Sequence, residues 1–364
     1  MTRSLLWDAA PGEVRAGLVE DGALVEFRIF RPHRPLFIPG SLYSAKLLYR
    51  NGGKTFVEMG RHFEAQLENT PNLPEGAMIS VEMVRGPIPE PGRWKHAIVR
   101  WAPDVAARAD FGLHSPEAPK ARFLKHMVQS VETILCADAL IARDLQAVLD
   151  AGTPAVSIDA AAIADADFDS LIENAVHGEF PIENGMLSIE RTRAMTMIDI
   201  DGGGDPMLLN LAAALEIPRL LRLLDIGGQI GIDFLNLPDR KARLQVDAAL
   251  EAACKPLGQH ERTAMNGFGF VQIVRPRPGP SIPEILCGTT PGRMTFDSRA
   301  VVLLRTAARS VGHGKRQLVA HPSIIELIAQ WPDEVAALQA SLGVAIELVP
   351  DAQLSGYGHV HVSP

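Results

Sequence analysis

Cysteine is scarce in this chain, and its spacing excludes two kinds of small-domain framework. The three cysteines, Cys136, Cys254 and Cys287, lie far apart and form no CxxC pair. A disulfide framework needs an even set of cysteines, and a structural zinc site needs paired ones. The sequence therefore predicts reduced thiols and a cytoplasmic location.

Long apolar runs and an excess of positive charge are also missing. No stretch reaches the roughly 18 uncharged apolar residues of a membrane-spanning helix, and the start, MTRSLLWDAAPGEV, has no signal-peptide core. The formal net charge of −8 argues against a protein that coats nucleic acid or anionic membrane by bulk electrostatics. A local basic patch could still steer a polyanion, so net charge does not identify the partner.

The composition fits a folded protein with more than one domain. The 364 residues exceed the roughly 100 to 200 of an ordinary domain. A hydrophobic content of 47% with 21% charged residues is far from the composition of disordered chains. We expect folded structure nearly throughout, in two or three domains.

Turn residues divide the first hundred residues into short strands. Residues 14–32 are typical of a hairpin, because Asp21 and Gly22 supply a tight turn between two apolar runs. Residues 35–103 contain short alternating stretches separated by glycine and proline, which predicts a small β-barrel or sandwich. A nucleic-acid-binding barrel of the OB type is one member of that class.

Helices and strands alternate in the rest of the chain. Residues 104–122 have no sustained periodicity and are predicted to be a connector, and apolar residues at helical spacing predict a helix over 123–149. Residues 186–200 indicate two strands, or one strand after a turn. Residues 206–226 predict a helix that Pro218 kinks or divides and that a glycine pair ends. The tail predicts a small α/β unit.

Two apolar strands end in aspartate where each leaves the core. In TMIDIDGGGDP, residues 196–206, strand alternation places Asp199 and Asp201 on one face. QIGIDFLNL repeats the form with Asp233, and the helix between the two strands makes a βαβ unit with parallel strands. Ligands of parallel sheets bind beyond the carboxyl ends of the strands, so Asp199 and Asp233 are predicted to meet there.

A divalent cation would explain this pair of carboxylates. Adjacent strands lie roughly 4.8 Å apart, which lets both side chains hold one Mg²⁺ at Mg–O distances near 2.1 Å; Mn²⁺ is the alternative ion. The ion would activate water and shield phosphate charge, and glycines 202–204 would let a bulky substrate approach. The alternative is that both aspartates only solvate strand ends. Asp205 and Pro206 are interpreted as a helix cap and first turn.

The two acidic segments resemble the ribonuclease E/G family of endoribonucleases. MIDIDGGGD and RLLRLLDIGGQIGIDFLNL are similar to that family's catalytic core, and the resemblance, strongest over about 168 to 280, covers most of the chain. It implies that Asp199 and Asp233 are magnesium ligands. Asp201 falls where the family usually has asparagine, and we include it as a third catalytic residue.

The resemblance also implies a set of RNA-binding residues. GSLYSAKLLYRNGGKTFVEMG resembles the family's OB-type domain, in which Phe56 matches a base-stacking aromatic and Lys95 a phosphate-contacting lysine. A position in the barrel core is the alternative for Phe56, because Gln66 replaces the family's second aromatic. A basic rim for RNA is predicted from the arginines after the second acidic strand: Arg240, Arg243, Arg275 and Arg277.

Two features of the family have no counterpart here. The loop that senses a 5′-monophosphate is not found in 104–122, and its partner arginine is Gly267. Cys287 stands where the family has a cysteine pair that shares zinc between subunits, and the second cysteine is absent. The resemblance therefore implies a short form without the sensor or the zinc link, and leaves the oligomeric state open.

The predicted fold is α/β with several domains: a mixed-sheet catalytic core with a βαβ unit, an inserted OB-like barrel and a small C-terminal α/β domain. The predicted segments are an N-terminal hairpin (1–33), the barrel (34–105), a connector (106–122), the rest of the N-terminal core, RNase H-like by resemblance (123–190), the metal-binding subdomain (191–290) and the C-terminal domain (291–364).

The predicted function is Mg²⁺-dependent hydrolysis of single-stranded RNA. The alternatives are a non-catalytic RNA-binding protein of the same fold and a different metal-dependent phosphoesterase. No membrane partner is expected. No side-chain general base is evident, because His62, His260 and His313 are scattered and are interpreted as surface or structural residues.

Overall fold

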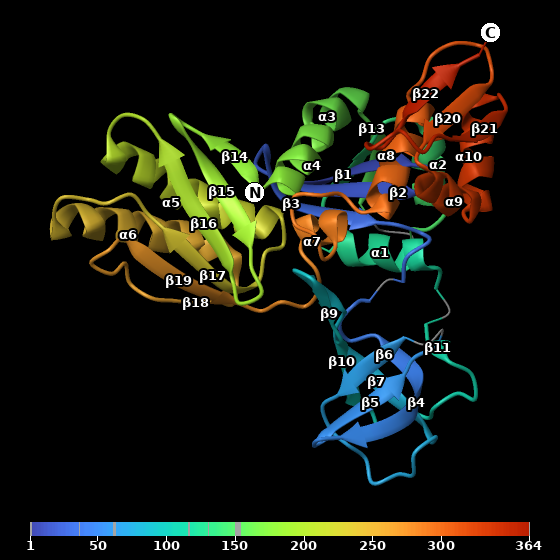
Figure 1. Ribbon diagram of the computed structural model, residues 1–364, viewed down its shortest axis with the longest axis horizontal. Coiled ribbons are helices and arrows are strands. Elements are labelled where there is room, and N and C mark those ends of the chain that lie inside the picture. Colours follow the sequence, from blue (N-terminus) through green and yellow to red (C-terminus); the bar gives the residue numbers. More distant parts are fainter. Residues whose placement is uncertain are drawn as a thin grey trace. The chain divides into compact units, whose positions relative to one another are not determined.

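The computed structural model describes residues 2–35, 37–60, 63–115, 117–129, 131–149 and 154–363 (Figure 1). His62 lies outside these residues. The chain forms two compact units: unit 1 is Met1–Pro35, Pro119–His177 and Leu286–Pro364, and unit 2 is Leu36–Ala118 and Gly178–Ile285. The six segments predicted from the sequence are finer than this division, and their boundaries stay predictions.

Unit 1 contains a five-stranded sheet in the order β13-β12-β1-β2-β3. Its strands are β1 (Arg3–Ala10), β2 (Glu13–Glu20), β3 (Ala23–Phe30), β12 (Thr133–Cys136) and β13 (Ala155–Ile158). Asp21 and Gly22 connect β2 to β3 with positive φ angles of 46° and 85°. The predicted hairpin is confirmed, and β1 extends it to three antiparallel strands.

The predicted helix over 123–149 is wrong. The segment forms α1 (Pro119–Met127), then β12, then α2 (Ala139–Gln146). Leu135, which fits the helical spacing, lies in β12 opposite Leu6 of β1. Asp138 then caps the start of a new helix. Pairing with a strand more than a hundred residues away overrides the local spacing, and that partner is not visible in the segment itself.

The remaining elements of unit 1 are two helices and the C-terminal domain. The helices are α3 (Ala160–Asp165) and α4 (Phe168–His177). The domain consists of α8 (Phe296–Ala308), β20 (Arg316–Ala320), α9 (Pro322–Ala329), α10 (Pro332–Leu342), β21 (Ile346–Pro350) and β22 (His359–Val362). Its sheet has the order β21-β20-β22, and Leu304, Leu318 and Ile328 lie in its core. The predicted small α/β unit is confirmed.

Unit 2 begins with a closed five-stranded barrel in the order β4-β5-β6-β10-β7, in which β7 pairs back with β4. Its strands are β4 (Leu42–Asn51), β5 (Lys54–Glu58), β6 (Glu64–Leu67), β7 (Met78–Arg85) and β10 (Ala97–Trp101). The hairpin β8 (Ile88–Glu90) and β9 (Arg93–Lys95) and the short β11 (Gly112–Leu113) accompany it. Val57, Val81 and Val99 lie in the barrel core. The predicted OB-like barrel is confirmed.

A six-stranded mixed sheet forms the rest of unit 2, in the order β14-β15-β16-β17-β19-β18. Its strands are β14 (Glu179–Ile182), β15 (Gly185–Arg191), β16 (Thr196–Gly202), β17 (Gly228–Asp233), β18 (Glu261–Arg262) and β19 (Phe270–Arg275), and the helices are α5 (Pro206–Leu223) and α6 (Arg240–Cys254). A 3₁₀ turn, η1 (Lys255–Leu257), follows α6. β16 and β17 are parallel and joined by α5, which confirms the predicted βαβ unit.

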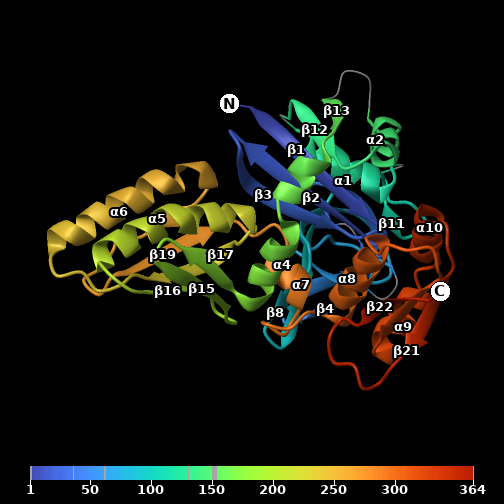
Figure 2. The same ribbon diagram turned by 90° about the horizontal axis from the view of Figure 1, so that it is seen from above.

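The two faces of this sheet differ. Ile198 and Ile200 of β16 and Ile232 of β17 are buried on the face toward the helices, and α5 and α6 run side by side there (Figure 2). Alternation puts Asp199 and Asp233 on the other face, where both are exposed. The chain passes from unit 2 to unit 1 within α7 (Ile282–Cys287).

The helix after the acidic strand ends differently from the prediction. α5 is one helix with Pro218 inside it, so Pro218 does not divide it. The left-handed residue after its end is Asp225, with φ 54°, rather than a glycine. Gly227 is needed for another reason, because a Cβ there would come within 2.4 Å of the Pro276 carbonyl oxygen.

The remaining predictions concern the state of the cysteines and the absence of a membrane-spanning helix. Cys136, Cys254 and Cys287 are all buried and free, and burial raises the pKa of the Cys254 thiol to about 11. Free, buried thiols fit the predicted reduced state, and their burial indicates a structural role. Of the helices in the described ranges, none is both long and apolar enough for a membrane crossing.

Candidate functional site

Two aspartates lie side by side at the end of the parallel strand pair. Asp199 of β16 and Asp233 of β17 are partners in the register of the ladder. Side chains of paired residues stand on the same face, and neighbouring strands are about 4.8 Å apart. The meeting of the two acidic strand ends is therefore confirmed as geometry, whereas their role as metal ligands stays a prediction.

These carboxylates have no counter-ion among the residues that the structure describes. Among the residues that the structure describes, the side chains of Asp199, Asp201 and Asp233 make neither an ion pair nor a hydrogen bond. In the same ranges no group of three or more His, Cys, Asp or Glu residues gathers as a metal cage. Mg²⁺ binds through one or two carboxylates and keeps several waters, so the pair fits Mg²⁺, whereas a structural zinc site needs four protein ligands.

Asp201 extends the acidic face by one more position. It lies two residues after Asp199 in β16, roughly 7 Å along the strand, and pairs with Met186 of β15. It is exposed like its neighbour. The structure thus places a third carboxylate on the face of the pair, and its catalytic role stays a prediction.

The three glycines after the acidic strand have different reasons. A Cβ at Gly202 would come within 2.6 Å of the Asn184 carbonyl oxygen and 2.7 Å of Leu209, so close packing requires glycine there. Gly203 and Gly204 have no such neighbour within 4 Å, and Gly204 has φ +94°. Of the three, only Gly203 and Gly204 leave open space beside the acidic face. The prediction that glycines let a substrate approach therefore rests on these two residues.

Two polar side chains of α5 fix the segments that carry the aspartates. Asp205 caps the helix by accepting a hydrogen bond of 2.9 Å from the Met207 amide, as predicted. Asn210, fully buried, donates to the Leu235 carbonyl at 2.8 Å and accepts from the Leu235 amide at 3.0 Å. This reciprocal pair holds the chain just after Asp233. The sequence analysis missed it, although a lone asparagine inside MLLNLAAAL is a usable signal.

Two apolar side chains pack next to the acidic pair on the same face of the sheet. Gly231 is the register partner of Met197 and lies two residues before Asp233. A Cβ at Gly231 would come within 2.7 Å of the Phe270 ring and 2.8 Å of the Met197 sulfur. Met197 and Phe270 therefore cover Gly231 on the face that carries the aspartates. The sequence analysis missed this contact, since it depends on the pairing of β17 with β19.

Phe56 of the barrel lies outside the barrel core. In β5 the buried Thr55 and Val57 alternate with the partly exposed Phe56, whose ring packs edge-on against His96 at 5.2 Å. Gln66 lies directly opposite Phe56 in the ladder. The alternative of a core position is therefore wrong, and base stacking by Phe56 stays a prediction.

Lys95 is held by an acidic partner. Its Nζ lies 2.6 Å from Glu90, and Arg93 lies 2.7 Å from the same side chain. Burial alone would raise the pKa of Glu90, but the hydrogen bonds and charges of Lys95 and Arg93 together lower it. Lys95 remains 43% exposed, so its ammonium is open to solvent on one side. Its contact with phosphate stays a prediction.

The four arginines do not form one continuous rim. Arg240 and Arg243 lie in the first turn of α6, which follows Asp233. Arg275 lies opposite Gly228, five residues or roughly 17 Å along the ladder from the Phe270–Asp233 pair. Because β19 runs antiparallel to β17, residues late in β19 lie at the opposite end of the strands from Asp233.

The two late arginines already have partners in the protein. Arg275 donates from Nη1 to the carbonyls of Leu221 and Ile226, at 2.8 and 2.7 Å, and so fixes the end of α5. Arg277 pairs with Glu284. Binding of RNA by each of the four arginines stays a prediction.

Cys287 is a buried residue of unit 1. It is 2% exposed, and its Sγ donates to the Val176 carbonyl of α4 at 3.9 Å. The position that the resemblance aligns with a zinc ligand is therefore turned into the core of this chain.

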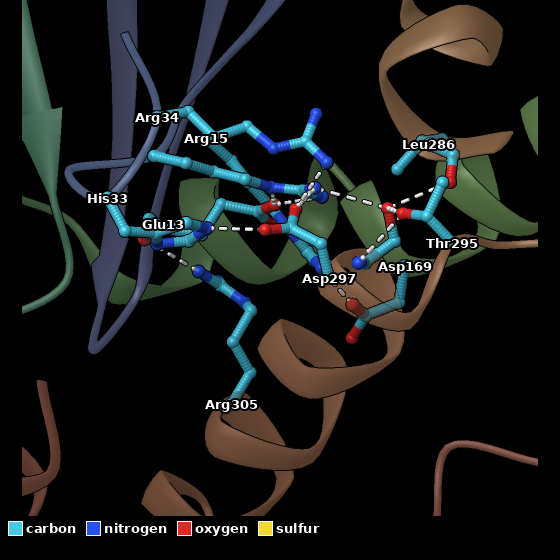
Figure 3. Close-up of polar contacts among 11 residues, drawn as sticks. Glu13, Arg15, His33, Arg34, Asp169, Leu286, Thr295, Asp297 and Arg305 are labelled. Carbon is cyan, nitrogen blue, oxygen red and sulfur yellow. Dashed lines mark hydrogen bonds and ion pairs between the residues drawn. The ribbon is translucent and has the colours of Figure 1, made fainter. Parts of the chain in front are cut away.

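A second set of charged residues lies in unit 1, between β2, β3 and α8 (Figure 3). Glu13 bonds Arg15 and Arg31 at 2.8 Å, and Arg31 also lies 2.5 Å from Asp297. Burial would raise the pKa of Asp297, but the hydrogen bond from His33 and the charges of Arg31 and neighbouring groups hold it well below its usual range. Each acid here is matched by a cation of the chain, which indicates a structural role.

Comparison with known proteins identifies a relationship for the middle of the chain. The sequence model of the Ribonuclease E/G family matches residues 106–278, which include both acidic strands. Ribonuclease G of Escherichia coli (strain K12) is 33% identical over 138 residues, which cover 34% of this chain and 28% of ribonuclease G.

Two further relatives match a similar share of the chain. Ribonuclease E of Escherichia coli (strain K12) is 35% identical over 127 residues, covering 32% of this chain and 12% of ribonuclease E. A chloroplastic ribonuclease E/G-like protein of Arabidopsis thaliana is 32% identical over 129 residues, covering 32% and 13%. The match thus spans 28% or less of the length of these curated relatives.

Proposed function

The chain belongs to the ribonuclease E/G family, and from this premise we propose that it is an endoribonuclease that hydrolyses phosphodiester bonds of single-stranded RNA. One observation carries the proposal. Asp199 and Asp233 are register partners on an exposed face, and no group of the described chain neutralises them. Two such carboxylates repel a phosphate unless a cation lies between them and the RNA.

In this proposal Asp199 and Asp233 hold one Mg²⁺, for which Mn²⁺ can substitute. The bound ion would lower the pKa of water and shield the charge that develops on the phosphate. The protein contributes geometry: the ladder fixes both carboxylates relative to each other, and the Asn210 pair fixes the segment after Asp233. Asp201 would add a third negative charge to this face and so help to attract a cation to the pair. The resemblance implies products with 5′-phosphate and 3′-hydroxyl ends.

The barrel supports a single-stranded substrate. Phe56 lies on its outer surface, where a partly exposed aromatic ring can stack on a base. Lys95, which precedes His96 in the sequence, is 43% exposed and offers an ammonium to a phosphate. Unpaired bases present their faces to such surfaces, whereas bases in a duplex do not. The cytoplasmic location stays a prediction, and the oligomeric state is open.

Cleavage of a short, end-labelled single-stranded RNA tests the proposal. The purified chain should cut it with Mg²⁺ and not with EDTA. Asp233→Asn should lower the rate by more than about 100-fold, since even residues that only orient metal ligands cost 10- to 100-fold. Asp165→Asn, an exposed change in α3, is the matched control and should cut like the wild type.

Other outcomes would support the alternatives. If the wild type binds the RNA but leaves it intact with every divalent metal, the chain is an RNA-binding protein of this fold. If it hydrolyses p-nitrophenyl phosphate diesters and not RNA, it is a different phosphoesterase. If Asp233→Asn cuts RNA at the wild-type rate, the paired aspartates are not the active site.

A further inference from the structure

Phe268 is an aromatic residue that the fold leaves in water. Its side chain is 83% exposed, whereas Phe234 in the same part of the sheet is 3% exposed. Leaving a phenylalanine in solvent forgoes about 1.5–3 kcal/mol of burial free energy. A lone exposed apolar residue is ordinary on a mobile loop, so what matters here is how firmly the backbone of Phe268 is held.

The turn that carries Phe268 is fixed by hydrogen bonds on both sides. The Asn266 side-chain oxygen accepts from the amides of Phe268 at 2.9 Å and Phe270 at 3.1 Å. The Asn266 amide donates to the Phe270 carbonyl at 3.1 Å. Gly269 has φ +86°, and a Cβ there would come within 2.7 Å of the Phe234 carbonyl oxygen. The backbone around Phe268 therefore has little freedom to fold the ring back onto the protein.

The turn lies at the end of the strands where the acidic pair is found. Phe270, the first residue of β19, is the register partner of Asp233. Phe268 precedes it by two residues, a chain length of at most about 7 Å. Phe270 itself covers Gly231 on the face of the aspartates. A substrate phosphate at Asp199 and Asp233 would thus have the Phe268 ring within reach of an adjoining nucleotide.

We infer that Phe268 is a stacking platform for a base of the RNA whose phosphodiester lies at Asp199 and Asp233. The inference rests on the proposed function. A base stacked on an aromatic ring gains about 1–3 kcal/mol, and every base has a suitable face, so Phe268 positions the strand without selecting sequence. A ring on a rigid turn loses little conformational entropy when the base binds.

The surroundings favour a base over a protein partner. A protein interface needs a contiguous apolar patch of several hundred Å². Phe268 is flanked in sequence by Asn266, Gly267 and Gly269, which supply polar backbone and no apolar side chain. The nearby aspartates would also have to be desolvated by an apolar partner surface. A single ring of this kind matches one base.

The test pairs the ring with individual bases of the RNA. One RNA sequence is made as a series in which each member lacks one base near the cleavage site. Binding is measured with the slow-cutting variant Asp233→Asn, either with Phe268 intact or with the added change Phe268→Ala, Phe268→Leu or Phe268→Trp. We expect Phe268→Ala to weaken binding of the complete RNA by about 5- to 150-fold. Removal of one particular base should weaken binding by a similar factor when Phe268 is intact. The same removal should have no effect on binding to the Phe268→Ala variant.

The other variants separate stacking from general apolarity and from fold. Phe268→Trp should keep the dependence on that base, and Phe268→Leu should lose it. Tyr357→Ala, which removes an aromatic that is 48% exposed in unit 1, should bind like the parent. Equal binding by Phe268→Ala, or an unchanged profile along the base series, would overturn the inference. A change of oligomeric state in Phe268→Ala, seen by sedimentation, would assign the ring to a contact between copies and overturn it as well.

The design distinguishes failure of this inference from failure of the proposed function. The base series is read by RNA binding and does not depend on cleavage. If the wild type never cleaves RNA but the Phe268-dependent profile appears, only the nuclease proposal fails. If the wild type cleaves with Mg²⁺ but Phe268→Ala shows wild-type kcat/KM on every member of the series, only the stacking inference fails.

Discussion

Both units of the chain gather acidic side chains, but they balance the charge in opposite ways. In unit 1, Glu13 and Asp297 are buried and bonded to arginines of the same unit. In unit 2, Asp199 and Asp233 stand next to each other, and within the described ranges neither has a cationic partner. The counter-ions of the first set are side chains of the same unit, whereas the proposed counter-ion of the second is a cation from solution.

This difference separates structural acids from candidate functional ones better than the number of charges does. The cluster of unit 1 is the denser one. Burial alone would raise the pKa values of Glu13 and Asp297, but the cations around them lower both values. Such a network is satisfied within the fold, and removing one of its members would leave a buried charge uncompensated. A solvent-facing pair of like charges adds a small repulsion and no stability by itself, so a role in binding the proposed cation would account for it.

The largest expected effect comes from breaking the balance in unit 1. Glu13→Gln removes the shared anion between Arg15 and Arg31, which are both buried. Arg15 and Arg31 keep Asp169 and Asp297 as partners, but the buried network is left with an uncompensated positive charge. Removing one partner of a buried ion pair typically costs about 3–5 kcal/mol of the free energy of unfolding. Urea unfolding should show this loss for Glu13→Gln, while Glu326→Gln, an exposed change in α9, should stay within about 0.5 kcal/mol of wild type. A loss below about 1 kcal/mol would mean that the network is not structural.

The pair in unit 2 should respond to a cation instead. If Asp199 and Asp233 hold Mg²⁺ in the folded state alone, Mg²⁺ at about 100 times its dissociation constant should raise the free energy of unfolding by about 2.7 kcal/mol. Without metal, Asp199→Asn should be at least as stable as wild type, because it removes a repulsion. Thermal unfolding with Mg²⁺ and with EDTA measures both effects.

A matched pair of variants sharpens this result. Glu13→Gln should start from a lower Tm but keep the full increment from Mg²⁺. Asp199→Asn should lose the increment and keep its Tm. If Mg²⁺ raises the Tm of Asp199→Asn as much as that of wild type, the ion binds elsewhere and the contrast between the two regions does not hold.

Local patterns of the sequence were enough to predict part of the fold and the acidic pair. Asp21 and Gly22 fix a hairpin within their own neighbourhood, and the period of two in a strand is enough to place Asp199 on the outer face. The parallel pairing of the two acidic strands followed from the helix between them, which brings Asp233 beside Asp199.

Most of the failures involve partners that are distant in the sequence. Leu135 fitted a helix until β1 supplied a strand to pair with. The packing of Phe270 over Gly231 and the position of Arg275 both depend on the antiparallel pairing of β19 with β17. No pattern within β17 indicates this pairing. Asn210 carried a signal, because an amide within an apolar helix needs a buried partner, but the partner itself could not be read from the sequence.

The smallest expected effect lies at the border of the network in unit 1, where acid and solvent meet. Asp169 bonds Arg15 and Arg309, yet its side chain is 56% exposed. Burial would raise its pKa, but these two hydrogen bonds lower the pKa of Asp169 to about 2. Solvent screening at so exposed a group limits its contribution to about 1 kcal/mol or less.

The pH dependence of Asp169→Asn then has a definite sign. A carboxyl whose pKa is depressed by folding takes up its proton first in the unfolded state, so its contribution is complete above pH 4 and is lost as the pH falls toward about 2. The stability of wild type should exceed that of Asp169→Asn by about 1 kcal/mol or less at pH 7, and the two should converge by pH 2. Urea unfolding across this range measures the difference. A constant difference from pH 7 to pH 2 would mean that Asp169 acts through packing, and that even the exposed border of unit 1 is not balanced by charge.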